Sequence, residues 1–171
     1  LFSKFNHTVA QILLTGSDFS HEDRHENFNN TLARLLELGV LPIINENDTI
    51  ATEEIKVGDN DTLSALVAVS AKADLLILLS DIDGLFTADP HTDPSATLLS
   101  VVEEINDDIM ALGGGSGSSL GTGGMHTKLH AAQICTESGC DMIIANGSDP
   151  KILYAITEND SPRCTLFKGK K

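Results

Sequence analysis

The 171-residue chain is 41% hydrophobic and carries a formal net charge of −14, so it has enough apolar sequence for one domain with a buried core. The acidity leaves no basic footprint, which excludes nucleic acid and anionic membrane surfaces as expected partners. No apolar stretch approaches the roughly 20 residues of a membrane-spanning helix, and no secretory leader is visible. Three cysteines, Cys135, Cys140 and Cys164, form no CxxC pair and are typical of reduced thiols in a cytoplasmic protein.

Apolar runs predict four strands, at residues 9–15, 40–44, 75–80 and 142–145. Helical patterns lie between them. The first carries Phe28 to Leu36 and stops at Gly39, the second begins at a cap formed by Asn60 or Asp61, and the third carries Leu129 to Cys135 and stops at Gly139. Strands that alternate with helices predict an α/β fold with parallel strands and right-handed crossovers.

Two stretches interrupt this alternation. Residues 81–99 contain two prolines and several turn residues, and residues 107–127 contain two glycine-rich runs. Both are longer than an ordinary connection, and loops of that length are often functional.

The strand at 40–44 ends abruptly in amides and acids. Ligands of open α/β sheets bind beyond the carboxyl ends of such strands, so residues 45–61 are the first candidate site. An exposed acidic loop is one explanation of this run. The other is a site in which acids, amides and one lysine hold the ammonium and carboxylate groups of an amino acid. Its candidate side chains are Asp48, Lys56, Asp59, Asn60 and Asp61.

The run Gly121-Thr122-Gly123-Gly124-Met125-His126-Thr127-Lys128 leads directly into a predicted helix. Glycines let the backbone approach an anion, and a helix N-terminus offers free N–H groups and a positive dipole. Phosphate binding and a flexible loop are both consistent with these residues. The run is not a Walker A sequence, because no Gly-Lys-Ser/Thr is present.

Two other patterns are weak alone. Asp81-Ile82-Asp83-Gly84 follows a strand and fits a turn, a metal ligand pair or a ribose contact. His21-Glu22-Asp23-Arg24-His25 matches HExxH, which in zinc hydrolases requires both histidines on one buried helical face. Its polar flanks favour an exposed segment with no metal, and the sequence predicts no resident metal site.

Taken together, three stretches resemble the amino-acid kinase family. Residues 80–90, Ser-Asp-Ile-Asp-Gly-Leu-Phe-Thr-Ala-Asp-Pro, are similar to the family's nucleotide-side motif. Residues 44–48 and 56–61 are similar to the glutamate-binding segment of the members that phosphorylate glutamate, and residues 121–128 to their second nucleotide loop. The resemblance implies a three-layer α/β sandwich with a mainly parallel central sheet.

The resemblance also implies ATP-dependent phosphorylation of the γ-carboxylate of L-glutamate, the first step of proline synthesis. Asp48 and Asn60, with Asp59 and Lys56 beside them, would contact the substrate. Lys128 would neutralise the transferred phosphoryl group, and Asp61 would orient the catalytic lysines. ATP with Mg²⁺ would be held by Ser80, Asp81, Thr122, Gly123, Gly124, Met125, His126, Thr127 and Lys128.

Further expectations follow from the same resemblance. Proline is expected as a feedback inhibitor, and self-association into a homo-oligomer is expected. The chain starts at Leu1, within a strand pattern. It is therefore expected to be one kinase domain that lacks its first strand, glycine-rich loop and second lysine, and to be inactive alone. It is also expected to carry no PUA domain. The alternatives are a kinase of acetylglutamate or aspartate, a zinc hydrolase built on residues 21–25, and a non-catalytic module that senses proline or nucleotide.

Overall fold

The computed structural model describes all residues except 1, 53–55, 115–123, 159, 161 and 171. Its elements, in chain order, are η1 (Phe2–Phe5), β1 (Val9–Leu14), α1 (Ser17–Ser20), α2 (Glu22–Glu37), β2 (Leu41–Glu46), α3 (Asn60–Ser70), β3 (Leu75–Ser80), β4 (Val101–Val102), α4 (Asp107–Ala111), α5 (Met125–Glu137), β5 (Asp141–Asn146), α6 (Ile152–Thr157) and β6 (Cys164–Phe167). Each of the four predicted strands and three predicted helices is present, and the α/β class is confirmed.

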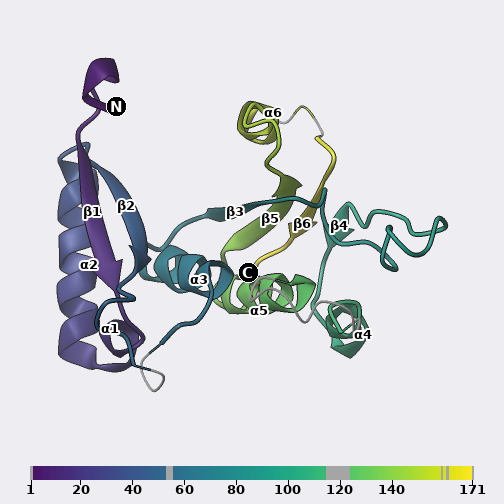
Figure 1. The fold of residues 1–171 in the computed structure, drawn as a ribbon, viewed down its shortest axis with the longest axis horizontal. Coiled ribbons are helices and arrows are strands. Elements are labelled where there is room, and N and C mark those ends of the chain that lie inside the picture. Colours follow the sequence, from purple (N-terminus) through teal and green to yellow (C-terminus); the bar gives the residue numbers. More distant parts are fainter. Residues whose placement is uncertain (1, 53–55, 115–123, 159, 161, 171) are drawn as a thin grey trace.

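The described strands form two sheets (Figure 1). Strands β1 and β2 pair in parallel, and the second sheet has the order β3-β5-β6-β4. Strands β3 and β5 are parallel, as are β4 and β6, whereas β5 and β6 are antiparallel. The expected mainly parallel pairing is confirmed. The β5–β6 pair is the antiparallel exception, because the chain passes through α6 and then returns beside β5 in the opposite direction.

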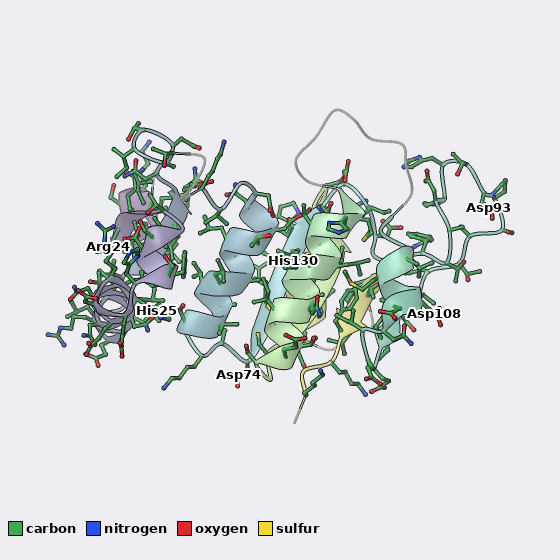
Figure 2. The ribbon with its side chains drawn as sticks, turned by 90° about the horizontal axis from the view of Figure 1, so that it is seen from below. Arg24, His25, Asp74, Asp93, Asp108 and His130 are labelled. Atoms are coloured by element: carbon green, nitrogen blue, oxygen red, sulfur yellow. The ribbon has the colours of Figure 1, made fainter. Side chains whose placement is uncertain are left out.

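Three apolar clusters stabilise these elements. One lies between α2, α3 and the β1–β2 pair and is built on Leu14, Phe28, Leu32 and Leu63. A larger one joins α3 and α5 to the four-stranded sheet, where Leu129, Met142, Ile144 and Phe167 have no exposed surface. A third places Ile156 of α6 on the opposite face of β5. Helices α3 and α5 therefore lie side by side over one face (Figure 2).

Capping explains where the helices begin and end. Gly39 and Gly139 follow α2 and α5 with φ of +66° and +82°, the left-handed conformation predicted for these stops. The cap of α3 is Asp59, whose carboxylate accepts a hydrogen bond from the Thr62 N–H at 2.7 Å. The prediction of Asn60 or Asp61 as the cap was wrong by one or two residues, since both lie inside the helix. Among the described residues, no helix is long and apolar enough to cross a bilayer.

Candidate functional site

The candidate site lies where the parallel strands end and two helices begin. Strand β2 ends at Glu46 and β3 at Ser80, while α3 and α5 begin at Asn60 and Met125. Helix N-termini carry unpaired N–H groups and a partial positive charge. Two such ends at one edge of an α/β fold favour an anionic ligand there.

An ion pair joins the two helix N-termini. Nζ of Lys128, in the first turn of α5, lies 3.0 Å from Oδ2 of Asp61, in the first turn of α3. The Thr127 hydroxyl donates to the same oxygen at 2.7 Å. The Lys128 and Asp61 side chains are only 10% and 18% exposed, so the pair is weakly screened by water. A loop predicted to bind substrate and a loop predicted to bind phosphate are therefore linked by one carboxylate.

Small residues make this approach of the two helices possible. Ala65 and Ala68 of α3 share a buried cluster with Ala131 and Ala132 of α5. Alanine lets helix backbones approach closely because no longer side chain separates them. The sequence thus brings Asp61 and Lys128 within reach of each other, although 67 residues separate them.

The predicted substrate residues follow β2 and precede α3. Asp48, Lys56 and Asn60 are exposed and available to a ligand. Asp59 is half-buried, and both of its carboxylate oxygens accept hydrogen bonds from Thr62, so its observed task is to cap α3. A direct contact of Asp59 with substrate stays a prediction.

The predicted nucleotide residues Ser80 and Asp81 end β3. The Ser80 hydroxyl donates to Asp81 Oδ1 at 3.1 Å, and Ser80 O accepts from the Gly147 N–H at 2.8 Å. Asn146, the last residue of β5, donates its side-chain amide to Asp83 Oδ1 at 3.0 Å. These contacts fix the two strand ends next to each other at the edge that also holds the helix N-termini.

Sequence reasoning missed three polar residues here. Glu46 is a buried carboxylate at the end of β2, Asn146 ends β5, and Arg163 pairs with Asp83 at 2.8 Å. The rule that ligands gather at carboxyl ends of strands, applied to every predicted strand, points to Glu46 and Asn146. No sequence pattern marks Arg163.

The glycine of the 81–84 run has a structural reason. A Cβ on Gly84 would collide with the Thr165 hydroxyl and lie 2.9 Å from the Thr165 backbone nitrogen. The absence of a side chain lets the loop press against β6, where the Leu85 N–H donates to Thr165 Oγ1 at 2.8 Å. This contact anchors the chain just after Ser80 and Asp81.

The glycine-rich run is described only in part. Thr122 and Gly123 lie outside the described residues. Gly124 precedes α5 and accepts the Thr127 hydroxyl at its carbonyl, Met125 opens the helix, and His126 is exposed. The predicted entry of this run into a helix is confirmed.

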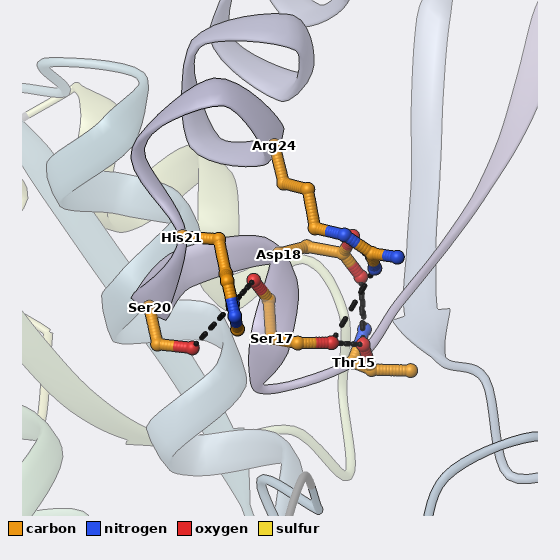
Figure 3. Close-up of polar contacts among 6 residues, drawn as sticks. All are labelled: Thr15, Ser17, Asp18, Ser20, His21 and Arg24. Atoms are coloured by element: carbon orange, nitrogen blue, oxygen red, sulfur yellow. Dashed lines mark hydrogen bonds and ion pairs between the residues drawn. The ribbon is translucent and has the colours of Figure 1, made fainter.

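The HExxH match does not form a metal-binding helical face. His21 is the N-cap of α2 and has an extended backbone (φ −107°, ψ 122°), so its side chain lies outside the helix although its carbonyl accepts the His25 N–H at 2.9 Å. Its Nδ1 lies 3.1 Å from Ser17 O and 3.2 Å from Ser20 Oγ (Figure 3). His25 Nε2 lies 2.9 Å from Ser70 Oγ of α3. In the described part of the chain, no three His, Cys, Asp or Glu side chains are grouped to hold a metal ion.

The family model described as "Amino acid kinase family" matches residues 1–146. The chain therefore belongs to the amino acid kinase family, as its motifs predicted.

Within this family, the chain is similar to proteins named glutamate 5-kinase. The chain is 52% identical over 169 residues to "Glutamate 5-kinase" of Caldanaerobacter subterraneus subsp. tengcongensis, covering 99% of this chain and 45% of the relative. It is 54% identical over 172 residues to "Glutamate 5-kinase" of Clostridium acetobutylicum, covering 99% of this chain and 63% of the relative. It is 55% identical over 152 residues to "Glutamate 5-kinase" of Deinococcus radiodurans, covering 89% and 42%. The chain thus spans about half the length of most of these relatives.

Solved structures show the same fold. An isopentenyl phosphate kinase superposes with a TM-score of 0.69 at 20% identity, covering 97% of this chain and 61% of that structure. UMP kinase from Ureaplasma parvum gives a TM-score of 0.63 at 12% identity, covering 97% and 62%. At these identities the likeness concerns the fold and not the substrate.

Proposed function

We propose that this chain forms part of an enzyme that transfers the γ-phosphoryl group of ATP to the γ-carboxylate of L-glutamate. The observation that carries the proposal is the ion pair between Asp61 and Lys128, because it joins the substrate side of the site to the phosphate side. High similarity to proteins named glutamate 5-kinase supports the choice of glutamate.

The substrate would bind between β2 and α3. Asp48 offers a carboxylate to the α-ammonium group, and Asn60 offers an amide that can donate to and accept from the substrate. Asn60 opens α3, whose N-terminal N–H groups favour a carboxylate. Lys56, exposed on the same loop, adds a positive charge for a dicarboxylic acid.

ATP would bind between the carboxyl end of β3 and the start of α5. The N–H groups of the first turn of α5, with Thr127 and Lys128, are suited to phosphate oxygens. The Ser80 hydroxyl and the exposed Asp81 carboxylate are oxygen ligands of the kind that Mg²⁺ takes. Bound Mg²⁺ would neutralise charge on the phosphate groups.

The chemistry asks little of a general base. The γ-carboxylate of glutamate is ionised at neutral pH and is already a nucleophile. Catalysis is then a matter of positioning the two anions and stabilising the transferred phosphoryl group, which a fixed ammonium group does. Asp61 would hold Lys128 in place for that task, and not accept a proton itself.

A direct assay tests this function on the protein expressed from its complete reading frame. ADP release is followed by a coupled assay with L-glutamate, N-acetylglutamate or L-aspartate as acceptor. We expect turnover with glutamate at a kcat/KM at least 100-fold above that for the other acids. Preference for N-acetylglutamate or aspartate would reject glutamate as the substrate while retaining the kinase class.

Asp48→Asn is the matched variant for substrate binding. We expect the KM for glutamate to rise about tenfold or more, because a charge-assisted hydrogen bond is lost, with the KM for ATP unchanged. Asp93→Asn removes the same charge from an exposed loop distant from both helix N-termini (Figure 2) and serves as the control. An Asp48→Asn enzyme with wild-type KM for glutamate would contradict the assignment.

Two properties of the whole protein belong to the same proposal. Proline, which shares the α-amino and α-carboxylate groups of glutamate, would compete at the loop that carries Asp48 and Asn60. We also propose a homo-oligomer and a cytoplasmic location, the latter supported by the absence of any disulfide among Cys135, Cys140 and Cys164.

A further inference from the structure

We propose that Glu46 is a positioning residue that holds the two arms of the substrate loop together and thereby sets the affinity for the amino-acid substrate. The first arm is residues 47–52, which carry Asp48, and the second is residues 56–59, which lead to Asn60. The proposal rests on the proposed function, because it assigns the substrate to this loop.

The Glu46 carboxylate bridges the two arms. Glu46 is the last residue of β2 and only 9% exposed. Its Oε1 accepts a hydrogen bond from the Val57 N–H at 2.6 Å, and its Oε2 accepts one from the Gly58 N–H at 3.2 Å. Two successive N–H groups that converge on one anion form a strong and specific contact. The contact closes the chain on itself over 11 and 12 residues.

The first arm is fixed at its start. The Asn47 N–H donates to Leu14 O at 2.7 Å, which ties the end of β2 to the end of β1. The Asn47 carbonyl then accepts from the N–H groups of Ile50 and Ala51 at 3.2 and 3.0 Å. Asp48 therefore lies in a turn that begins one residue after Glu46.

The second arm runs from the Glu46 contact into α3. Gly58 has φ of +94°, a left-handed conformation that costs little only for glycine, and it sets the direction of the chain toward α3 directly after the Gly58 N–H meets the carboxylate. Asp59 follows as the N-cap, and Asn60 opens the helix. Asp48 thus lies two residues beyond Glu46, and Asn60 lies two residues beyond Gly58.

This geometry predicts a selective effect on substrate binding. Without the Glu46 contact the arms would separate, and Asp48 and Asn60 would no longer be held at one spacing. The phosphate side would keep its own supports, because Asp61 is anchored by Lys128 and Thr127 and α3 is packed on α5. A residue that merely supported the fold would weaken both substrates alike.

Glu46→Gln in the complete protein tests the proposal. The glutamine has the same shape and keeps one oxygen, but its NH₂ group cannot accept a backbone N–H. We expect the KM for glutamate to rise about tenfold, the KM for ATP to stay near wild type, the Tm to fall by no more than a few degrees, and hydrogen exchange at residues 57 and 58 to accelerate. Glu46→Ala, which removes both acceptors, should raise the KM for glutamate further.

Glu37→Gln is the control, because it makes the same change on an exposed side chain at the end of α2. It should leave both KM values and exchange at residues 57 and 58 unchanged. An unchanged KM for glutamate in Glu46→Gln, or equal losses for glutamate and ATP together with a lower Tm, would overturn the proposal. A wild-type enzyme that shows no glutamate-dependent ADP release would instead refute the proposed function, and the role of Glu46 would fall with it.

Discussion

The ion pair between Asp61 and Lys128 predicts a measurable coupling between α3 and α5. Two unit charges 3.0 Å apart attract with about 5 kcal/mol at the effective dielectric constant of about 20 that suits protein sites. Desolvation offsets much of this. Removal of one partner costs about 3–5 kcal/mol in fully buried pairs, and exposed pairs contribute about 1 kcal/mol or less. With side chains 10% and 18% exposed, this pair should contribute about 2 kcal/mol.

A double-mutant cycle measures this quantity directly. Asp61→Asn, Lys128→Met and the double variant are prepared in the complete protein, and their free energies of unfolding are determined in urea. Asp61→Asn should lower the free energy of unfolding by about 2–3 kcal/mol, because the Lys128 ammonium group then faces an amide where it had a carboxylate. The losses of unfolding free energy in the two single variants, added together, should exceed the loss in the double variant by about 2 kcal/mol.

The Arg34–Glu37 pair is the matched control for that cycle. Its atoms lie 2.9 Å apart, but its side chains are 67% and 65% exposed. An exposed pair at i, i+3 should show a coupling of about 0.5 kcal/mol or less. If the Asp61–Lys128 coupling were no larger than that of the control, the ion pair would not order Lys128 in solution, and the ordering role of Asp61 would be refuted.

Three further predictions concern other parts of the molecule. Gly84→Ala should lower the free energy of unfolding by about 2 kcal/mol or more, measured in urea, because its Cβ collides with Thr165. His25→Ala should lower it by about 1 kcal/mol through loss of the Ser70 contact yet keep kinase activity; zinc bound stoichiometrically to wild type and lost with activity in this variant would favour a hydrolase. Burial raises the pKa of Cys135 to about 12, so its native thiol should label roughly 100-fold or more slower than the denatured one near pH 8.5. The free energy of unfolding should fall as the pH rises above about 9, because the Cys135 thiol then loses its proton in the unfolded chain but keeps it in the folded one.

Periodicity predicted the long elements because their apolar residues are close together in sequence. The strand at 75–80 matches β3 residue for residue, and the helix that stops at Gly39 matches the end of α2. Strand β6 was missed because its four residues include the buried polar Thr165, whose hydroxyl pairs with Leu85 and Leu99. Burial of that threonine is set by partners 66 and 80 residues away, which no local pattern contains.

In the candidate site, too, sequence motifs predicted some residues, while others became evident only from contacts between distant parts of the chain. The family resemblance predicted that Asp61 orients the catalytic lysines, and in the structure Asp61 forms an ion pair with Lys128. Glu46 lies inside one of those motifs but was not predicted as a functional residue, because a glutamate at a strand end has no pattern that marks it as buried. Its proposed role rests on two backbone N–H groups, of Val57 and Gly58, that donate to it across a loop.

In the proposed enzyme, the placement of Asp61 would couple the substrate side of the site to the phosphate side. Asn60 and Asp61 are neighbours in the first turn of α3, so the proposed substrate contact and the observed lysine contact come from one helix. In that enzyme, the Asp61 carboxylate would hold Lys128 before ATP binds, which would avoid the entropy cost of ordering a long side chain during the reaction. We propose that Glu46 orders the two arms of the substrate loop in the same way, through the Val57 and Gly58 N–H groups. In the proposed enzyme, both anions would therefore meet groups that the protein has already oriented, and Asp48 and Lys128 would act on their separate ligands from positions set by the Glu46 and Asp61 carboxylates.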